Sequence, residues 1–315
     1  MDQIILTGLT MKIESYSYID AFHAILTSKD WIACSKELMA GMTAMSFRFT
    51  VNRRLTVESS TAYNWMAEHF VAADLLGVKT SQHAGYSFQP TFPLYQKQAV
   101  HIIKQSIRQG TGAMIWKDSF VVVSGYDDEQ GVLLYCNGSS EQLQSLKYED
   151  FGRNESPYWY YQLYEGKIQL DRYEVYKESL MQAVSKWETH DVLLPQNDYA
   201  CGRAAYDAIV EALASGDYDH DGAFETFRCY GAAKRDSARY LSSLQHIWPP
   251  CTRVSELYAH VADLFDVIVS RTNEDGKLLI PLFKNAQQYE AMAIEELRKL
   301  FTEDVHNRFD DLGLR

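Results

Sequence analysis

Residues 112–138, GAMIWKDSFVVVSGYDDEQGVLLYCNG, carry the pattern that decides the fold of the first half of the chain. Two apolar runs, Phe120–Ser124 and Val132–Cys136, are joined by Gly-Tyr-Asp-Asp and further turn residues. Short β-branched and aromatic runs between turn residues are typical of antiparallel strands. One more strand is expected before them, at Ala113–Trp116, and another in the aromatic segment 156–166, SPYWYYQLYEG. The first half is therefore predicted to contain a small antiparallel sheet.

Before and after these strands in the sequence, apolar residues recur at intervals of three and four, which predicts helices. In the first half the expected helices cover 18–28, 35–41, 61–77 and 93–109. After residue 170 no further strands are expected, and helical stripes cover 176–187, 206–213, 254–268 and 285–301. This order predicts an α+β fold, with a helix-plus-sheet domain at residues 1–170 and an all-helical domain at residues 171–315.

The composition restricts the classes of partner. The chain has 315 residues and a formal net charge of −12, which argues against a nucleic-acid surface. No apolar run approaches the roughly 20 residues needed to span a bilayer, so no membrane partner is expected. The N-terminus lacks a basic region followed by a small-residue cleavage site, and the five cysteines show no CxxC spacing. Reduced thiols and a cytoplasmic location are the expectation.

Two segments together carry a family resemblance: SKELMAGMTAMSFRF at 35–49 and DSFVVVSGYDDEQGVLLYCNG at 118–138. They resemble the N-terminal domain of butirosin-type side-chain acyltransferases, a papain-like group related to the cysteine peptidases that process bacteriocin leaders. The resemblance implies a papain-like fold and a role in bacterial natural-product biosynthesis. It also implies acyl transfer from a carrier-protein thioester to an amine, through a cysteine acyl-enzyme.

The same resemblance implies the partners and the catalytic positions. The expected partners are a small-molecule substrate and an acyl carrier protein; no cofactor is expected, and a homo-oligomer is left open. The family's nucleophile position falls on Ser17, its imidazole position on Ser119 and its third catalytic position on Asn137. Asp118 is the remaining candidate base beside this hairpin. The alternative for Ser17 is a helix N-cap, a position that serine favours.

No histidine occurs between His101 and His190, so no strand of the predicted sheet offers an imidazole. A serine hydroxyl needs a base to become a nucleophile near neutral pH. Two readings of the function follow. The chain is either an acyl- or aminoacyl-transferase-like enzyme with a substituted site, or an inactive papain-like pseudoenzyme that binds a small molecule or a carrier-bound chain.

Two cysteines are alternative nucleophiles. Cys34 immediately precedes the helix expected at Ser35, where a thiol can become acidic. Cys201 belongs to a Cys-Gly pair at the start of a helix, but the spacing of the later His220 and His246 indicates no partner for it. The structural alternative for both is an inert, buried thiol.

Three arginines, Arg48, Arg53 and Arg54, lie in a segment without acidic residues and are candidate substrate-binding side chains. The alternative is that each pairs with an acid from elsewhere in the chain. No HExxH motif or similar ligand pair occurs, so no metal site is predicted.

Residues 217–228, DYDHDGAFETFR, match the first half of an EF-hand calcium loop. The position that should carry a bidentate glutamate is Arg228, whose charge would repel the ion. Calcium binding is therefore expected to be weak or absent.

Overall fold

The computed structural model describes residues 3–140 and 142–301, and the chain divides into two compact units. The N-terminal unit comprises residues 1–36 and 77–169, and the C-terminal unit comprises residues 37–76 and 170–315. One division between the units falls between residues 169 and 170. Residues 37–76, however, belong with the second unit, because strand β2 (Thr50–Asn52) pairs there with strand β9 (Tyr199–Cys201).

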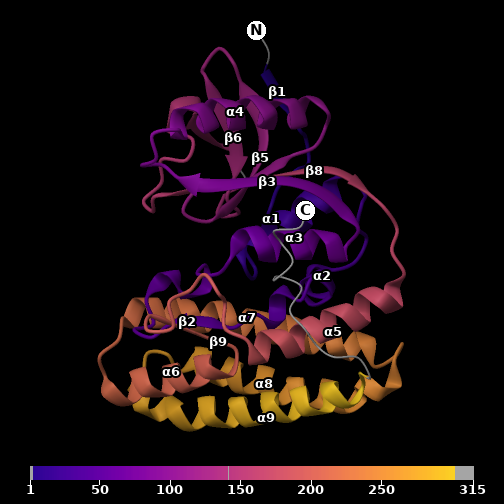
Figure 1. Cartoon of the computed structure of the whole chain (residues 1–315), viewed down its shortest axis with the longest axis vertical. Coiled ribbons are helices and arrows are strands. Elements are labelled where there is room, and N and C mark those ends of the chain that lie inside the picture. The colour runs from indigo at the N-terminus through magenta and orange to yellow at the C-terminus, as the bar shows by residue number, and fades with distance from the viewer. Residues whose placement is uncertain (1–2, 141, 302–315) are drawn as a thin grey trace. The chain divides into compact units, whose positions relative to one another are not determined.

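The N-terminal unit is built on an antiparallel sheet in the order β3-β8-β4-β5-β6-β7, with β1 added alongside β5 (Figure 1). Its strands are β1 (Gln3–Ile5), β3 (Val78–Tyr86), β4 (Ala113–Trp116), β5 (Phe120–Asp127), β6 (Val132–Cys136), β7 (Gln144–Lys147) and β8 (Tyr158–Lys167). The predicted hairpin is present, with Val122 opposite Cys136. The mixed α+β character expected from the sequence is confirmed.

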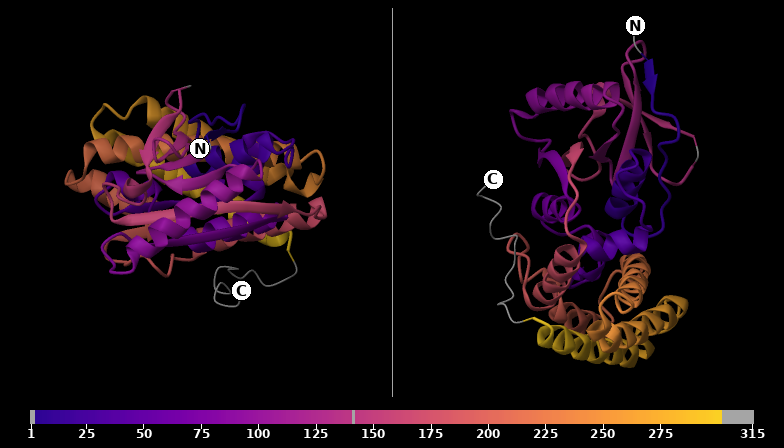
Figure 2. Two further views of the ribbon diagram at one scale, coloured as in Figure 1. Left: turned by 90° about the horizontal axis from the view of Figure 1, so that it is seen from above. Right: turned by 90° about the vertical axis from the view of Figure 1, so that its right-hand side faces the viewer.

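Two helices, α1 (Ser17–Ser28) and α4 (Phe92–Arg108), cover opposite faces of this sheet (Figure 2). Side chains alternate between the faces of a strand, and this alternation separates the two cores. Val121, Val123 and Tyr161 pack with the apolar face of α4. Phe120 and Tyr164, which point the other way, contact Tyr18 and Phe22 of α1. The start of β5 therefore lies beside the start of α1.

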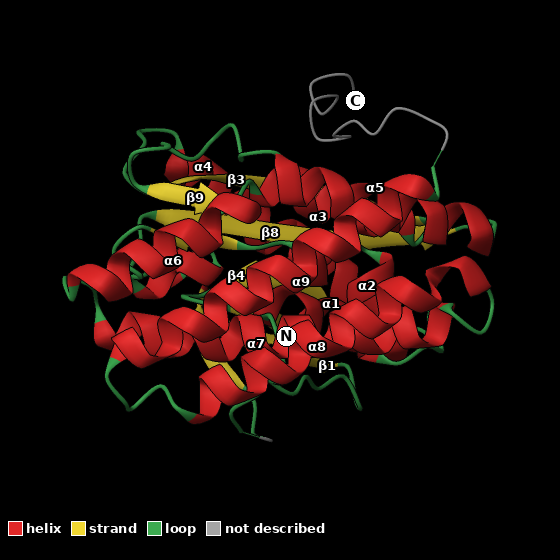
Figure 3. Ribbon diagram, turned by 90° about the horizontal axis from the view of Figure 1, so that it is seen from below, coloured by secondary structure: helices red, strands yellow, loops and turns green. Residues whose placement is uncertain are grey.

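The C-terminal unit is mainly helical (Figure 3). Its helices are α2 (Lys36–Met42), α3 (Trp65–Leu75), α5 (Arg172–Glu188), α6 (Arg203–Ser215), α7 (His220–Leu244), α8 (Thr252–Ser270) and α9 (Ile280–Lys299). A further division between the two units falls after Lys36, the first residue of α2. Short 3₁₀ helices of this unit cover Met45–Phe47, Val57–Ser60, Pro249–Cys251 and Gly276–Leu279, and another, Tyr148–Asp150, belongs to the N-terminal unit. After residue 170 the described chain is helical, as predicted, apart from the three-residue strand β9, which forms because residues 37–76 supply its partner β2.

Segment 217–228 is the beginning of α7 rather than an ion-binding loop. Helix α7 starts at His220, and the Asp219 carboxylate caps it by accepting the Gly222 backbone N–H at 3.0 Å. Arg228 lies on the helix and pairs with Glu225. The half-match to an EF-hand loop therefore reflects a helix N-terminus. Among the residues that the structure describes, no group of three His, Cys, Asp or Glu side chains is arranged to hold a metal ion.

One buried carboxylate joins four helices of the C-terminal unit. Glu290 of α9 accepts hydrogen bonds from Tyr206 of α6 at 2.6 Å and from Tyr258 of α8 at 3.1 Å. Lys234 of α7 contacts both of its oxygens, at 2.6 and 2.7 Å. Burial lowers the pKa of Lys234, and the Glu290 charge opposes that shift. The charge pair is thus fully engaged inside the helical core.

Within residues 3–140 and 142–301, no helix combines the length and the apolar character that a bilayer crossing requires.

Candidate functional site

The two family-matched positions Ser17 and Ser119 lie near each other in the N-terminal unit. Ser17 is the first residue of α1, and its hydroxyl oxygen accepts the backbone N–H of Phe120, the first residue of β5, at 3.2 Å. Ser119 is the next residue back along the chain, so the Ser17 and Ser119 positions adjoin each other. The N-cap alternative is wrong, because Tyr16 occupies the cap position and the Ser17 side chain bonds to the strand instead.

Neither Asp118 nor Asn137 is available to activate Ser17. Asp118 has a φ of +59° in the turn between β4 and β5. Its carboxylate accepts the Glu155 backbone N–H at 2.9 Å and pairs with Lys117 at 2.7 Å. Asn137 follows β6, and its side-chain oxygen accepts both the backbone N–H and the hydroxyl of Ser139. Both polar groups stabilise their own turns.

The structure also corrects the expectation that the sheet carries no histidine. His83 lies on β3, a strand that the sequence did not indicate, where it is exposed and stacks on Tyr161. Strand β3 is three strand spacings from β5, about 14 Å, so His83 does not reach Ser17. His23 of α1 bonds through Nε2 to the Cys34 carbonyl oxygen at 3.1 Å. The Ser17 position therefore has no imidazole partner among the described residues of this unit.

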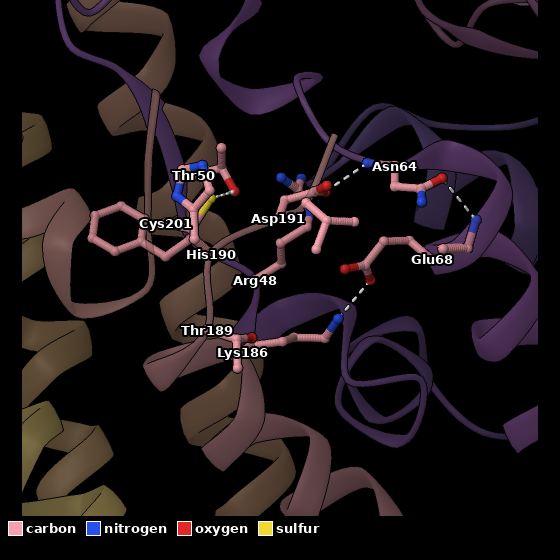
Figure 4. A pocket seen from close by; sticks show the side chains of 12 residues that line it. Arg48, Thr50, Asn64, Glu68, Lys186, Thr189, His190, Asp191 and Cys201 are labelled. Carbon is pink, nitrogen blue, oxygen red and sulfur yellow. Dashed lines mark hydrogen bonds and ion pairs between the residues drawn. The ribbon is translucent and has the colours of Figure 1, made fainter. Parts of the chain in front are cut away.

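A second candidate site lies wholly within the C-terminal unit. It is a small pocket of about 50 Å³, here called the Cys201 pocket, lined by residues 48–50, 64, 67–68, 186, 189–192 and 201. Figure 4 shows Thr50, His190 and Cys201 at one side of it, with Asn64 and Glu68 at the other. Two residues named from the sequence, Arg48 and Cys201, thus lie in one pocket.

Arg48 brings a permanent positive charge to this pocket. The residue is 3% exposed; its Nη2 donates to the Ser60 carbonyl oxygen at 2.8 Å, and its guanidinium lies 3.8 Å from the centre of the Tyr63 ring. Its charge acts on the neighbouring titratable groups. Burial holds the pKa of His69 well below its ordinary value, and the Arg48 charge lowers it further.

The other ionised side chains of the pocket balance this charge. Lys186 pairs with Glu68 at 2.6 Å, and burial lowers the pKa of Lys186 while Glu68 opposes that change. The Asp191 carboxylate accepts the backbone N–H of Asn64 at 2.8 Å and that of Leu193 at 2.9 Å. Two formal positive charges therefore face two formal negative charges, and the pocket as a whole is close to neutral.

The Cys201 sulfur faces hydrogen-bond donors. Thr50, its partner across the β2–β9 pair, donates its hydroxyl to the sulfur at 3.6 Å, and the Asp191 backbone N–H is a further donor. The Tyr230 hydroxyl holds Thr50 in place, because it donates to the Thr50 carbonyl and accepts the Thr50 N–H at 2.8 Å. Burial raises the pKa of Cys201, and the Asp191 charge adds to this shift, whereas the two donors and the Arg48 charge lower it.

Gly202 sets the direction of the chain directly after Cys201. It has φ +56° and ψ −128°, and its N–H donates to the Phe49 carbonyl oxygen at 2.7 Å. A Cβ at this position would lie 2.3 Å from the Trp187 carbonyl oxygen and 2.4 Å from that of Lys186. Only glycine fits this turn, which leads from β9 into α6.

The histidine of this pocket is His190, in the loop between α5 and β9. Its Nε2 lies 2.8 Å from the Leu194 carbonyl oxygen, which can only accept, so Nε2 carries the proton and Nδ1 holds the lone pair. The histidines that follow Cys201 in sequence are placed elsewhere: His220 lines a separate, wider depression of about 560 Å³.

The remaining candidates do not join the Cys201 pocket. Cys34, half-buried, belongs to the N-terminal unit. Arg53 and Arg54 are exposed; Arg53 bonds to the Gln196 carbonyl oxygen at 3.0 Å, and Arg54 pairs with Asp217 at 2.9 Å. Arg53 also lies 3.7 Å from the Glu211 carboxylate, so each of these two arginines pairs with an acid from elsewhere in the chain.

Several pocket residues were not identified from the sequence: Thr50, Glu68, Lys186, His190 and Asp191. The sequence does contain an indication for two of them, because His190 and Asp191 lie about ten residues before Cys201 and Pro195 lies between. A proline-containing turn can return a chain on itself, and this one brings the pair beside the thiol.

No protein-family model matches the chain, and no curated protein matches it. The relationship to butirosin-type acyltransferases therefore stays a prediction from the two sequence motifs.

Proposed function

We propose that this protein belongs to the acyl- and aminoacyl-transfer lineage of bacterial natural-product biosynthesis and acts in the cytoplasm. Its N-terminal unit is papain-like but does not catalyse through the Ser17 position. Its substrate is an acyl group linked as a thioester to a small thiol or to an acyl carrier protein, and the acyl end binds in the Cys201 pocket. Amines are the acceptors.

The observation that carries this proposal is the convergence of Arg48 and Cys201 on one near-neutral pocket. A carboxylate ligand would add an unbalanced negative charge to a pocket whose charges already cancel, and burying such a charge is costly. A thioester carbonyl is neutral, yet its oxygen accepts hydrogen bonds. A volume of about 50 Å³ suits the carbonyl end of such a substrate, with the remainder of the molecule outside.

The absence of an imidazole beside Ser17 in the described part of the N-terminal unit supports the proposal that this unit does not catalyse through Ser17. The contact described for the Ser17 hydroxyl is with the backbone N–H of Phe120, which is a donor and cannot take the hydroxyl proton. The pseudoenzyme reading thus applies to the N-terminal unit alone.

The test is equilibrium binding of an unreactive amide analogue of S-acyl-N-acetylcysteamine, followed by calorimetry. Arg48→Met should weaken binding at least tenfold, whereas Arg53→Met removes the same charge from the surface nearby and should leave binding unchanged. Val192 is 80% exposed at the rim of the pocket, so Val192→Trp blocks entry without altering the core. Equal binding by all four proteins would refute the proposal.

A further inference from the structure

We propose that Cys201 is the nucleophile of its pocket: it takes the acyl group from the incoming thioester, and His190 accepts the thiol proton. This inference rests on the proposed function, since it assigns the chemistry of the same pocket. It moves the reactive centre from the N-terminal unit, where the family resemblance places it, to the C-terminal unit.

The backbone around Cys201 has the form that presents a nucleophile. Strand β9 ends at Cys201, Gly202 turns the chain with a positive φ, and α6 begins at Arg203. Glycine adopts a positive φ without steric cost, so the chain can turn sharply directly after the thiol. The thiol also lies at the start of a 13-residue helix, whose N-terminal dipole favours a thiolate.

Two hydrogen-bond donors and the Arg48 charge stabilise a negative charge on the sulfur, and the Asp191 carboxylate opposes them. Thr50 and the Asp191 N–H donate hydrogen bonds to it, and Tyr230 fixes Thr50 through both of its backbone polar groups. Burial nevertheless prevails and raises the pKa of the thiol, so Cys201 is protonated near neutral pH. Attack on a thioester therefore requires a base that removes the proton during the step.

His190 has the properties of that base. The hydrogen bond from Nε2 to the Leu194 carbonyl fixes the tautomer, which leaves the Nδ1 lone pair to accept a proton. This is the task that a carboxylate performs for the histidine of a catalytic triad. Both His190 and Cys201 line the same pocket of about 50 Å³ (Figure 4), so the two side chains border one small space.

The reaction balances without a cofactor. The Cys201 sulfur forms a bond to the carbonyl carbon as its proton moves to His190 Nδ1. The bond from that carbon to the donor's sulfur then breaks, and the donor leaves as a thiol after taking the proton from His190. An amine then attacks the Cys201 thioester, which yields an amide and restores the Cys201 thiol. Arg48 is placed to stabilise the oxyanion of each tetrahedral intermediate.

The other cysteines provide internal controls. Cys136 and Cys251 are 1% and 0% exposed, and neither lines the Cys201 pocket. Cys34 and Cys229 are half-buried and are the competing sites for adventitious acylation. The background protein for the test is therefore the double variant Cys34→Ala/Cys229→Ala, which keeps Cys201.

The experiment incubates this background protein with S-acyl-N-acetylcysteamine and measures acyl adducts by intact mass and peptide mapping. One adduct on Cys201 is expected, and Cys201→Ala should abolish it. His190→Gln retains a donor for the Leu194 carbonyl but has no basic nitrogen, so the acylation rate should fall about 10²–10⁴-fold at neutral pH. Raising the pH should restore part of this loss in His190→Gln by ionising the thiol directly, which a purely structural role would not produce.

The possible failures are distinguishable. If the amide analogue binds but Cys201 acquires no adduct, the nucleophile assignment is refuted and the proposed binding function stands. If the analogue does not bind, the proposed function itself fails. An adduct on Ser17, or on Cys34 in the unmodified chain, in place of Cys201 would refute the assignment and relocate the reactive site.

Discussion

The Ser17 hydroxyl oxygen accepts the backbone N–H of Phe120 at 3.2 Å, which fixes the start of α1 against the start of β5. Ser17 stands at the position where the acyltransferases that the two sequence motifs resemble carry a cysteine nucleophile. The hydroxyl completes the hydrogen bonding of a strand end, so its role is structural.

Ser17→Ala should therefore affect stability and not activity. The variant leaves the Phe120 N–H without this acceptor, at a cost of about 1 kcal/mol in the free energy of unfolding. Urea denaturation measures the loss, and Ser119→Ala, a half-buried neighbour, should change stability by less than about 0.5 kcal/mol. Loss of acyl transfer in Ser17→Ala, with folding intact, would contradict the assignment.

Calcium should have no effect on the melting temperature, because the Asp219 carboxylate caps α7 instead of binding an ion. Asp219→Ala removes the cap and should cost about 1 kcal/mol, with or without calcium. Asp217→Ala is the matched control, since Asp217 pairs only with the exposed Arg54 among the described contacts, and little change is expected. Stabilisation by calcium that disappears in Asp219→Ala would overturn this reading.

Gly202→Ala should destabilise the C-terminal unit by about 2–4 kcal/mol, because the new Cβ meets two carbonyl oxygens and the positive φ adds backbone strain. Gly216→Ala separates the two effects. Gly216 has φ +74° at the end of α6, and no atom lies within 4 Å of the place that an added methyl group would take, so only the backbone cost of about 1 kcal/mol applies. Equal losses in the two variants would show that the Gly202 turn is not sterically restricted.

Removing one member of the Lys234–Glu290 pair should be among the most destabilising changes in the helical core. Glu290→Gln leaves the Lys234 charge buried without its counter-ion, and about 3–5 kcal/mol should be lost. Arg253→Met breaks an exposed pair with Glu256 and should cost less than about 1 kcal/mol. A double-mutant cycle between Lys234→Met and Glu290→Met should give an interaction free energy of about 1–3 kcal/mol. Additive losses would mean that the two charges do not stabilise each other.

The elements that could be predicted from the sequence are those that depend on local patterns of apolar residues. The hairpin, α1 and α4 follow from apolar runs and spacing, and the adjacency of Ser17 and Ser119 follows from matching two motifs to one fold. Strand β3, with the sequence VKTSQHAGY, was not predicted from the sequence. It is an edge strand whose side chains are largely exposed, so its sequence lacks the alternation of apolar and polar residues. Helix α7 was not predicted because Gly231, Lys234 and Ser237 interrupt the apolar residues of its buried face.

The Cys201 pocket depends on long-range contacts that no local pattern encodes. Strands β2 and β9 have three residues each and are about 150 positions apart, yet their pairing brings Thr50 to Cys201. His190 reaches the pocket through the turn at Pro195, while the helical pattern directs attention to His220 and His246. Cys201-Gly202 was recognisable as a motif, but its partners required the tertiary structure.

Stability should fall steeply at alkaline pH, and the buried tyrosines give the sign. Burial raises the pKa of Tyr161 and that of Tyr230 to about 12, and it holds the pKa values of Tyr164, Tyr206 and Tyr258 well above the ordinary range. In the unfolded chain these phenols ionise near pH 10. Between pH 10 and about 12 the folded protein therefore binds more protons than the unfolded chain, so the free energy of unfolding decreases as pH rises.

Tyr161→Phe tests this account at a single site, because burial is the only influence that raises the Tyr161 pKa. Below pH 10 the variant should have a pH dependence like that of the unmodified protein. Above it, the slope of unfolding free energy against pH should become shallower by up to about 1.4 kcal/mol per pH unit, the contribution of one proton. Tyr95→Phe is the control, since Tyr95 is 42% exposed and packs beside Trp159 in the same unit. Urea denaturation at stepped alkaline pH, followed by circular dichroism, measures both slopes, and an unchanged slope in Tyr161→Phe would show that this phenol ionises freely in the folded protein.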